Sequence, residues 1–364
     1  MTTTFTSTTD GNINDGGTYG NTSPGSAGTD FPDTDDICVV GAGTDVTLNT
    51  NFECRAVKIT GTGSPGTLIA TSSYTLTVNG ATSNKPFDND GEISGDLNLT
   101  ITNTGLQQDD LLLDAMGSSG NLNDLTLNLA NGTTANKTVG ISETTTIDGN
   151  LTITSGTFDT VFSTGSSQTL TVTGQVSVTG TLTCNESTVN LGSLYITSNG
   201  VVNATNQTTT INKETTVSAA GFAVYNEGTF HHNNGLVVIG TDTNTIVYGM
   251  EGDDTSGADS NAFYRVQVEL DNAAYFCKFR PQAGTVAVKI ANDLTVAEGI
   301  VSQETATHSF EVDVDVSIEA GGVLGRTDIT GENKFGSLTI ASSGEYIATS
   351  GTTTITSRTG GSGT

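Results

Sequence analysis

Apolar and small polar residues alternate along most of this chain. In Tyr74–Val78, Leu97–Ile101 and Thr169–Thr173, an aliphatic or aromatic side chain alternates with Thr or Asn. This period of two is typical of β-strands that bury one face and expose the other. Gly, Asn and Asp interrupt the alternation at short intervals, and Gly and Asn accept the positive φ angles of tight corners. The pattern therefore predicts many short strands joined by corners.

Helical spacing is nearly absent from the chain. The best candidate, Leu111–Met116, is short and is followed by Gly117. A helix of ordinary length needs about three turns of apolar residues at intervals of three and four. We therefore predict that the protein is nearly all β.

A longer repeat is superimposed on the alternation. The segment Gly192–Ile211 aligns without a gap with Gly336–Ile355, and upstream Ile147–Ile153 matches Ile290–Val296. Other aligned apolar positions are Leu125, Leu127 and Leu129 with Val266, Val268 and Leu270. Self-similarity of this kind indicates an internal duplication in a stacked architecture.

Two all-β architectures fit this pattern, a parallel β-solenoid (β-helix) and a tandem array of β-sandwiches. Sandwiches usually have longer strands around a large aromatic or disulfide-pinned centre, whereas this chain has no Trp and 6% aromatic residues. A solenoid needs only small aliphatic side chains pointing inward from coils of about 20–25 residues. We favour the all-β parallel β-solenoid with an internal duplication and keep the tandem β-sandwich array as the alternative.

The duplication also sets the predicted domain boundaries. Large apolar side chains are scarce near the N-terminus, where Phe5, Ile13 and Tyr19 stand alone among Thr, Gly, Asn and Ser. The predicted parts are an extended N-terminal arm at 1–30, an N-terminal β cap region at 31–84, solenoid copy 1 at 85–212, solenoid copy 2 at 213–356 with a loop insertion near 248–262, and a tail at 357–364.

The charge of the chain restricts the classes of partner that we expect it to bind. The chain carries 39 acidic and 12 basic residues, for a net charge of −27. Binding to nucleic-acid phosphates needs a basic surface, so we expect no nucleic-acid partner. No apolar run reaches membrane-spanning length, and Met1–Thr6 begins no obvious signal peptide, so we expect no membrane insertion and no export by a cleavable signal.

Cysteine and histidine spacing predicts no metal or catalytic centre. The four cysteines lack the Cys-x-x-Cys spacing of zinc sites and are interpreted as core side chains, although Cys38 and Cys54 could meet across neighbouring coils. His231 and His232 are adjacent, and alternation would point them to opposite faces of a strand. His308 stands alone.

Acidic clusters offer the hard carboxylate oxygens that Ca²⁺ prefers, but none has a complete EF-hand loop. We favour solvated loops and predict no cofactor, with Ca²⁺ as the open alternative. The candidate ligands are Asp33, Asp35, Asp36, Asp253 and Asp254, beside related groups at Asp30, Asp88, Asp90 and Glu251.

One strand pattern places three carboxylates on a single face. Glu311, Asp313 and Asp315 alternate with valines, and carboxylates about 5–10 Å apart can hydrolyse glycosides. The matching earlier segment has Thr171, Thr173 and Gln175 instead. We interpret the three acids as an exposed acidic face, name no catalytic residue, and predict that the protein is not an enzyme.

A family resemblance rests on three segments near the N-terminus, Phe31–Val39, Thr44–Asn49 and Ala56–Gly61, and on the later Gly228–Gly235, Phe263–Val268 and Asn292–Val296. These resemble the repetitive β-solenoid proteins of bacteriophage virions, of the decoration or fibre type, which are similar in pattern to repetitive bacterial surface proteins. The resemblance implies a solenoid architecture and a virion or surface setting, and it implies no catalytic residues.

The function we expect is therefore that of a non-enzymatic virion structural protein. It would be a capsid decoration or fibre component at the virion surface that stabilises the particle and presents a surface. Its partners would be other virion proteins and further copies of itself, with a trimer suggested by analogy to phage appendages. The alternative is an extracellular or cell-surface receptor-binding protein, an adhesin that recognises host surface glycans. Thr-x-Thr runs such as Thr75–Thr77 also resemble those of ice-binding solenoids, but their spacing in the sequence is irregular.

Overall fold

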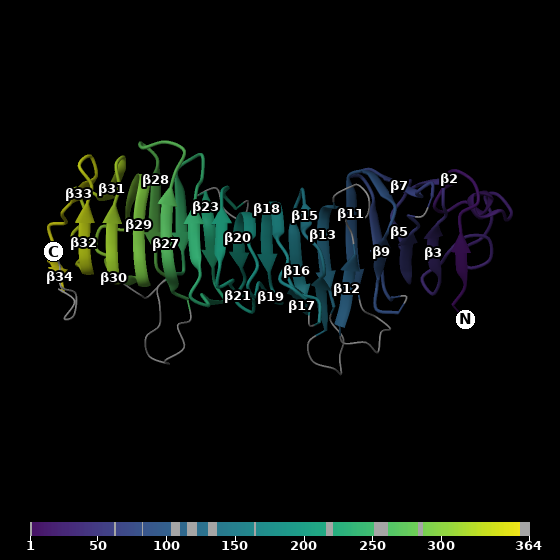
Figure 1. Cartoon of the computed structure of the whole chain (residues 1–364), viewed down its shortest axis with the longest axis horizontal. Helices are drawn as coiled ribbons and strands as arrows, with labels where there is room; N and C mark the ends of the chain where they lie inside the picture. The colour runs from purple at the N-terminus through teal and green to yellow at the C-terminus, as the bar shows by residue number, and fades with distance from the viewer. Residues whose placement is uncertain are drawn as a thin grey trace. The chain divides into compact units, whose positions relative to one another are not determined.

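The structure is a computed structural model that describes residues 2–356, apart from 62, 82, 103–109, 115–121, 130–136, 164, 216–220, 251–260 and 283–286. The described residues are nearly all β, and parallel strand pairs stack successive coils into a β-solenoid (Figure 1). This confirms the predicted fold class, because sandwiches are built from antiparallel sheets. In this part of the chain, no helix has both the length and the apolar character needed to cross a membrane.

The chain divides into two compact units. Unit 1 comprises Met1–Gly174 and Gly180–Asn185, and unit 2 comprises Gln175–Thr179 and Glu186–Thr364. The boundary therefore lies near residue 180, whereas the sequence repeat predicts a division at residues 212 and 213.

Three ladders of strands run along unit 1. Successive strands of a ladder belong to successive coils, except that β15 and β16 of the third ladder both pair with β13. The first contains β1 (Thr4–Thr6), β3 (Ile37–Val40), β6 (Ala56–Ile59), β9 (Phe87–Asn89), β12 (Asp110–Asp114), β14 (Thr138–Ile141), β17 (Thr157–Asp159) and β19 (Thr181–Thr183). The second contains β2 (Gly11–Asn12), β4 (Asp45–Thr47), β7 (Thr67–Ala70) and β10 (Glu92–Gly95). The third contains β5 (Phe52–Cys54), β8 (Thr75–Val78), β11 (Leu97–Thr102), β13 (Leu122–Asn128), β15 (Thr145–Ile147), β16 (Leu151–Ser155) and β18 (Leu170–Val178), whose last residues belong to unit 2.

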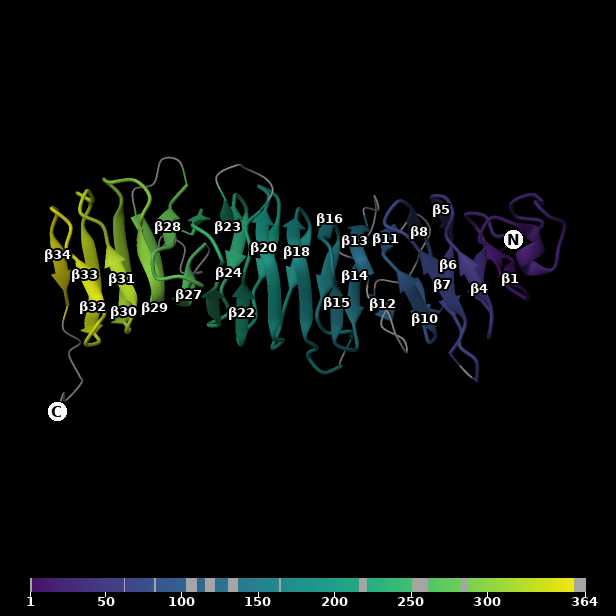
Figure 2. The same cartoon turned by 90° about the horizontal axis from the view of Figure 1, so that it is seen from above.

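Unit 2 repeats the same construction with longer strands toward its C-terminal end. Figure 2 shows β29, β30 and β32 lying side by side, as their parallel pairing requires. The strands are β20 (Val189–Ile196), β21 (Val201–Asn203), β22 (Thr208–Ile211), β23 (Phe222–Asn226), β24 (Thr229–His231), β25 (Leu236–Ile239), β26 (Thr245–Tyr248), β27 (Phe263–Glu269), β28 (Phe276–Arg280), β29 (Ala287–Gln303), β30 (Ser309–Ile318), β31 (Gly322–Gly325), β32 (Asn333–Ile340), β33 (Glu345–Ile347) and β34 (Thr353–Ile355).

Inward side chains of successive coils stack into a narrow core. In unit 1, Leu99 pairs with Leu125 and Leu125 with Leu151, and all three are essentially inaccessible to solvent. Each coil therefore covers the apolar side chains of its neighbours, which is how a solenoid builds a core from small residues.

The predicted repeat corresponds to equivalent strands. In β13 and β27, the aligned Leu125 and Leu127 and their counterparts Val266 and Val268 occupy the same places in identical patterns of buried and half-buried positions. The strongest match in the sequence covers β20 to β22 and β32 to β34, both in unit 2. The aligned apolar residues Leu194, Ile196 and Ile211 are buried, whereas their counterparts Leu338, Ile340 and Ile355 in the last strands are half-exposed or exposed.

The N-terminal residues differ from the extended arm that their composition predicts. Phe5, Ile13 and Tyr19 are all buried, the Tyr19 hydroxyl donates to the Ile13 carbonyl at 3.0 Å, and the rings of Phe5 and Tyr19 pack edge to face. A 3-10 helix, Gly16–Tyr19, lies in this segment with Asp15 as its N-cap. The three large apolar side chains of this segment are thus part of the buried core, so the segment is folded.

The residues predicted as a separate cap region are ordinary coils, because β3 to β8 belong to the same three ladders as the strands that follow. The short helical candidate of the sequence contains a strand, β12, in its described part. The predicted loop insertion lies mostly outside the described residues, and the predicted tail lies wholly outside them.

Candidate functional site

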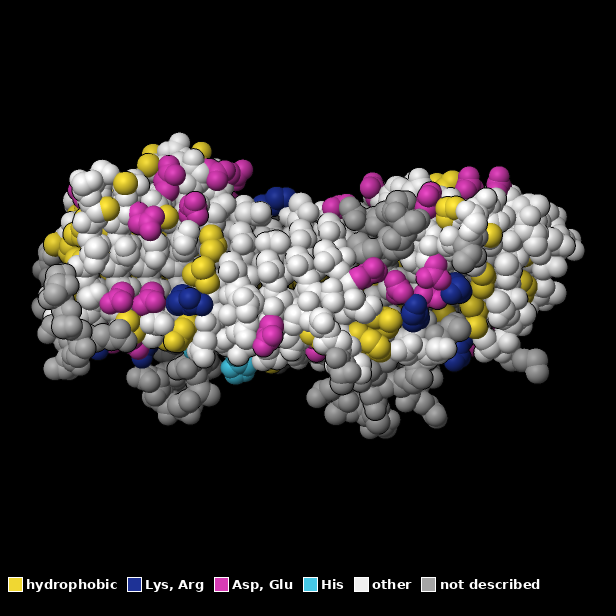
Figure 3. Space-filling view, viewed as in Figure 1, with side chains coloured by type: hydrophobic (Ala, Val, Ile, Leu, Met, Phe, Trp, Pro, Cys, Tyr) yellow, Lys and Arg dark blue, Asp and Glu magenta, His cyan; other side chains and the backbone are white. Residues whose placement is uncertain are grey.

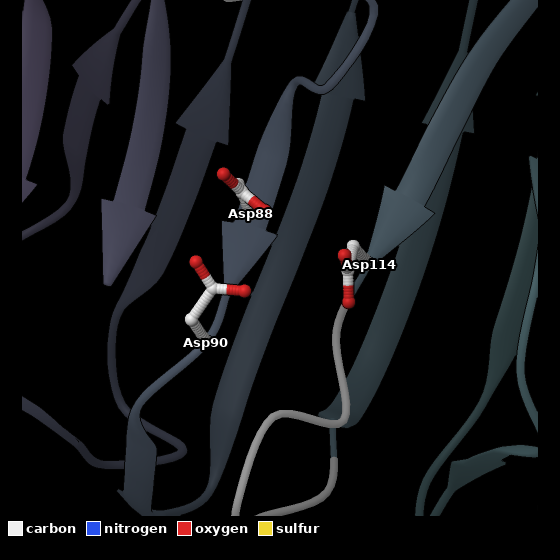
Figure 4. Close-up of side chains that lie close together, drawn as sticks. All are labelled: Asp88, Asp90 and Asp114. Atoms are coloured by element: carbon white, nitrogen blue, oxygen red, sulfur yellow. The ribbon is translucent and has the colours of Figure 1, made fainter. Parts of the chain in front are cut away.

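Two lysines and three aspartates form a charged cluster on the outer surface of unit 1. Lys58 Nζ lies 2.8 Å from Asp88 and 3.1 Å from Asp90, and Lys85 Nζ lies 2.6 Å from Asp88 and 2.7 Å from Asp114. Figure 3 shows acidic and basic side chains gathered over β9 and β12, and Figure 4 shows the three carboxylates on these neighbouring coils. We call these five residues the charge cluster.

Strand register brings the charge cluster together. Lys58 in β6 is the register partner of Asp88 in β9, and Asp88 is the partner of Asp114 in β12. Outward side chains at matched positions of adjacent parallel strands are about 4.8 Å apart. Residues far apart in the chain therefore become lateral neighbours on three successive coils.

The lysines and aspartates of the charge cluster shift each other's pKa values toward the charged forms. Burial alone would raise the pKa of Asp88, but hydrogen bonds from Lys58 and Lys85 outweigh burial and hold that pKa below its ordinary value of 3.8. Burial likewise opposes charge on Lys85, and its hydrogen bonds to Asp114 and Asp88 raise the pKa above its usual range. Both groups are thus charged at neutral pH.

The charge cluster is also the one place in the described residues where three carboxylates could share a metal ion. Oxygens of Asp88, Asp90 and Asp114 lie within 4.8 Å of one another. Ca²⁺ requires six to eight oxygen ligands, yet the ammonium groups of Lys58 and Lys85 already contact all three carboxylates. The geometry fits an ion-pair network that fastens coils together. Sequence reasoning considered Asp88 and Asp90 but missed Asp114 and both lysines.

The calcium candidates near the N-terminus have structural partners instead of a shared centre. Asp36 is buried and accepts backbone N–H groups from Thr3 at 2.7 Å and Asp33 at 3.3 Å. Asp33 in turn accepts the backbone N–H of Asp35 at 2.9 Å. These carboxylates shape the turn that leads into β3. Candidates Asp253 and Asp254 lie outside the described residues.

The acidic face predicted on β30 is also tied to adjacent coils. Glu311 is paired with Lys334 of β32, and Asp313 lies 3.3 Å from Lys289 of β29. Asp315 accepts a hydrogen bond from the Ser337 hydroxyl at 2.6 Å. Each acid of this face thus contacts a group on a neighbouring strand, as the acids of the charge cluster do.

A column of aromatic side chains runs along unit 2. Tyr195, Tyr225 and Tyr248 occupy matched positions of β20, β23 and β26, and Arg280 of β28 continues the column. The ring centroids of Tyr225 and Tyr248 are 4.7 Å apart with planes 15° apart, and those of Tyr195 and Tyr225 are 5.5 Å apart. We call these three tyrosines the tyrosine column. Sequence reasoning missed it because the residues are dispersed in the chain.

Neighbouring groups hold the tyrosine column in place. The buried ring of Phe222 packs edge to face against Tyr225 at 4.8 Å, and the Arg280 guanidinium lies 6.0 Å from the centre of the Tyr248 ring and pairs with Glu304. Burial and the nearby Glu227 raise the pKa of Tyr225, whose hydroxyl donates to Glu227 at 3.2 Å. The three tyrosines of the column are half-exposed, so the column forms part of the surface.

Threonines form a second regular column, in unit 1. Thr77, Thr100, Thr126 and Thr152 are register partners on four successive coils, and all are half-exposed. The runs that are irregular in the sequence are thus aligned laterally, because coil lengths compensate for their spacing.

The cysteines and the adjacent histidines take part in packing and in local hydrogen bonds. All four cysteines are free and buried. Burial raises the pKa of the Cys38 thiol to about 11, partly offset by a contact with the Tyr19 hydroxyl. His231 is half-exposed and His232 is buried, where its ring stacks on Tyr264 and its Nδ1 accepts the Asn234 N–H at 2.9 Å.

A small hollow near β14 and β17 has a volume of about 130 Å³ and is lined by Thr138, Gly140, Asp159, Val161, Phe162 and Ser163. The Asp159 carboxylate at its edge accepts hydrogen bonds from Val161 N–H at 2.7 Å and from the Asn185 amide at 2.5 Å. This carboxylate is therefore engaged in fixing the backbone of its own turn.

Comparison of the chain with protein-family models, curated proteins and solved structures found no match. The candidate sites rest on the geometry of the chain itself. The charge cluster and the tyrosine column share one property, which is that outward side chains are bound to those of the next coil.

Proposed function

We propose that this protein is a non-enzymatic structural component of a virus particle, a capsid decoration or fibre component that stabilises the particle and presents a surface. The observation that carries the structural role is the use of charged side chains in contacts between coils. Lys58, Lys85 and Lys334 each bind carboxylates on an adjacent strand or at its end. Charged groups arranged in this way reinforce the stack.

The physical properties of the chain suit exposure at the surface of a particle. Each coil buries its neighbours' apolar side chains, so the core is continuous within each unit. The net charge of −27 keeps such a surface soluble and disfavours nonspecific association. The virion setting itself comes from the resemblance of segments such as Phe31–Val39 to phage solenoid proteins.

The test is quantitative mass spectrometry of purified particles from the source, which counts copies of this chain relative to the major capsid protein. Copy numbers comparable with the capsid protein would support a decoration role, and a few copies would support a fibre. Absence from particles would overturn the virion assignment and favour an extracellular or cell-surface protein.

Recognition of host glycans is a second candidate, and the tyrosine column favours it. The hydroxyl of Tyr225 and the exposed carboxylate of Glu227 lie together on the outer surface, and such groups bind the hydroxyls of sugars. A glycan array probed with the protein and with Y225A/Y248A would test this. Loss of binding in that variant, with retention in T100A/T126A, would support it, and no glycan binding by the wild type would contradict it.

A further inference from the structure

Two side chains of the last coil of unit 2 are exposed, although the side chains at the matching positions of the preceding coils are buried. Ile340 and Ile355 are 45% and 51% exposed, and they are the large hydrophobic residues exposed in the described part of the chain. Their register partners one coil earlier, Ile318 and Phe335, are fully buried. The two isoleucines therefore point along the core into a position where another layer would cover them.

The backbone of this coil is open on the same side. β33 pairs with β31 and β34 pairs with β32, and the described strands supply no further coil beyond them. The outer edges of β33 and β34 thus offer unpaired N–H and C=O groups, which readily pair with another strand. We call this edge, with Ile340 and Ile355, the terminal face.

A series of hydrogen bonds between polar side chains holds the terminal face in a defined shape. The Gln303 side-chain amide donates to Asn333 Oδ1 at 2.7 Å, and Asn333 Nδ2 donates to the Tyr346 hydroxyl at 3.0 Å. The Tyr346 hydroxyl lies 2.8 Å from the Thr353 hydroxyl. These contacts join β29, β32, β33 and β34, so the face is preorganised for association.

Charge is scarce at the terminal face. In residues 336–356 the single charged side chain is Glu345, although the whole chain carries a net charge of −27. Elsewhere two copies of so acidic a protein would repel each other. Cores of protein interfaces are depleted in charged residues, so this face is where a second copy can approach at least electrostatic cost.

The first described coil of unit 1 differs from the terminal face. The first coil of unit 1 is itself covered, since Phe5, Ile13 and Tyr19 are buried. A head-to-tail stack would therefore join an open face to a closed one.

We propose that two copies of this chain associate through their terminal faces, tail to tail. A two-fold axis makes such a contact self-complementary, so that the isoleucines of one copy cover those of the other. The same axis runs the two outer edges antiparallel, and antiparallel strands pair through their free N–H and C=O groups. This proposal does not depend on the virion setting.

Sedimentation velocity of the full chain over a range of concentrations tests the proposal. We expect a dimer for the wild type. In I340K/I355K the dissociation constant should rise about tenfold or more, because two buried lysines in each copy would lack partners. The matched control S94K/T154K adds the same charge at exposed positions of unit 1 and should remain dimeric. Both variants should keep the far-ultraviolet circular dichroism of the wild type.

Variants that each carry one added, exposed cysteine decide the orientation when they are treated with a bifunctional maleimide. The four native thiols are buried and should not react. Tail-to-tail association predicts that T354C cross-links to itself, whereas T29C, in the covered N-terminal segment, does not. A wild type that is monomeric or trimeric, a dimer that persists in I340K/I355K, or cross-links only between T29C and T354C in a mixture would overturn the proposal. Absence of the chain from virus particles would leave these results unaffected.

Discussion

The ammonium group of Lys85 lies 2.7 Å from a carboxylate oxygen of Asp114, although the two residues are 29 positions apart in the chain. Asp114 is on β12, one coil beyond the β9 strand that Lys85 precedes. An ion pair between successive coils resists their separation more directly than one within a coil. The charge cluster is therefore expected to contribute to the cohesion of unit 1.

Removing one cation of the charge cluster should destabilise the protein. Lys85→Met keeps the side-chain length but leaves Asp114 without its lysine partner, and we expect a loss of about 1–2 kcal/mol in the free energy of unfolding. Urea denaturation measures this loss. Lys213→Met, which removes an exposed lysine, should have no measurable effect, and equal effects of the two substitutions would contradict a structural role for the cluster.

The stability of the charge cluster should fall in acid. The pKa of Asp88 is lower in the folded protein than its ordinary value of 3.8, so the folded state binds fewer protons than the unfolded state. Its stabilising contribution is present above that value and is lost as the pH falls through the folded pKa. We expect the melting temperature of the wild type to drop more than that of Asp88→Asn on acidification from about pH 6 to about pH 2. Parallel curves would show that Asp88 is not linked to folding.

Calcium should stabilise the wild-type charge cluster little, because two ammonium groups already occupy its carboxylates. In K58M/K85M the same three carboxylates have no cation and repel one another. Calcium should therefore raise the melting temperature of this variant more than that of the wild type. Differential scanning fluorimetry with Ca²⁺, and with excess chelator as the control, measures both. A large calcium shift in the wild type would instead identify a metal site.

The tyrosine column should contribute to the stability of unit 2. Tyr225 stacks on Tyr248 and contacts Tyr195 at a tilt. Tyr225→Ala removes both contacts at an expected cost of about 1–3 kcal/mol in unfolding free energy. Tyr225→Phe keeps the stacking and should cost less. Tyr74→Ala, outside the column, is the matched control. Thermal unfolding followed by circular dichroism compares the three, and a Tyr225→Ala protein as stable as the control would contradict the expectation.

The folded N-terminal segment should shield the thiol of Cys38. The Tyr19 hydroxyl contacts Cys38 Sγ at 3.5 Å, and the thiol is buried. Tyr19→Ala should open a path to Cys38, so a thiol reagent that leaves the native wild type unmodified should label this residue. Peptide mapping identifies the labelled cysteine. An unlabelled Cys38 in Tyr19→Ala, or the same labelling in Thr29→Ala, would show that Tyr19 is not the shield.

The alternation of apolar and polar residues predicted short strands, and the internal repeat and the scarcity of aromatic residues favoured stacked coils of a parallel solenoid over sandwiches. This prediction succeeds because every coil obeys the same local rule, with one face buried by its neighbours. Leu125 and Val266, aligned by the repeat, are indeed inward-facing residues of equivalent strands. The sequence alone therefore determined the fold class and the side of each strand that faces the core.

Tertiary structure alone decided which outward residues meet. Coil length varies, since Cys38 pairs with Val57 after 19 residues, whereas Val57 pairs with Phe87 after 30, and lateral neighbours depend on the sum of such lengths. The contacts of Lys85 with Asp114 and of Tyr225 with Tyr248 were therefore not visible as motifs. The folding of Phe5, Ile13 and Tyr19 was hidden for a related reason, because a few dispersed apolar residues form a core only when the chain brings them to one place.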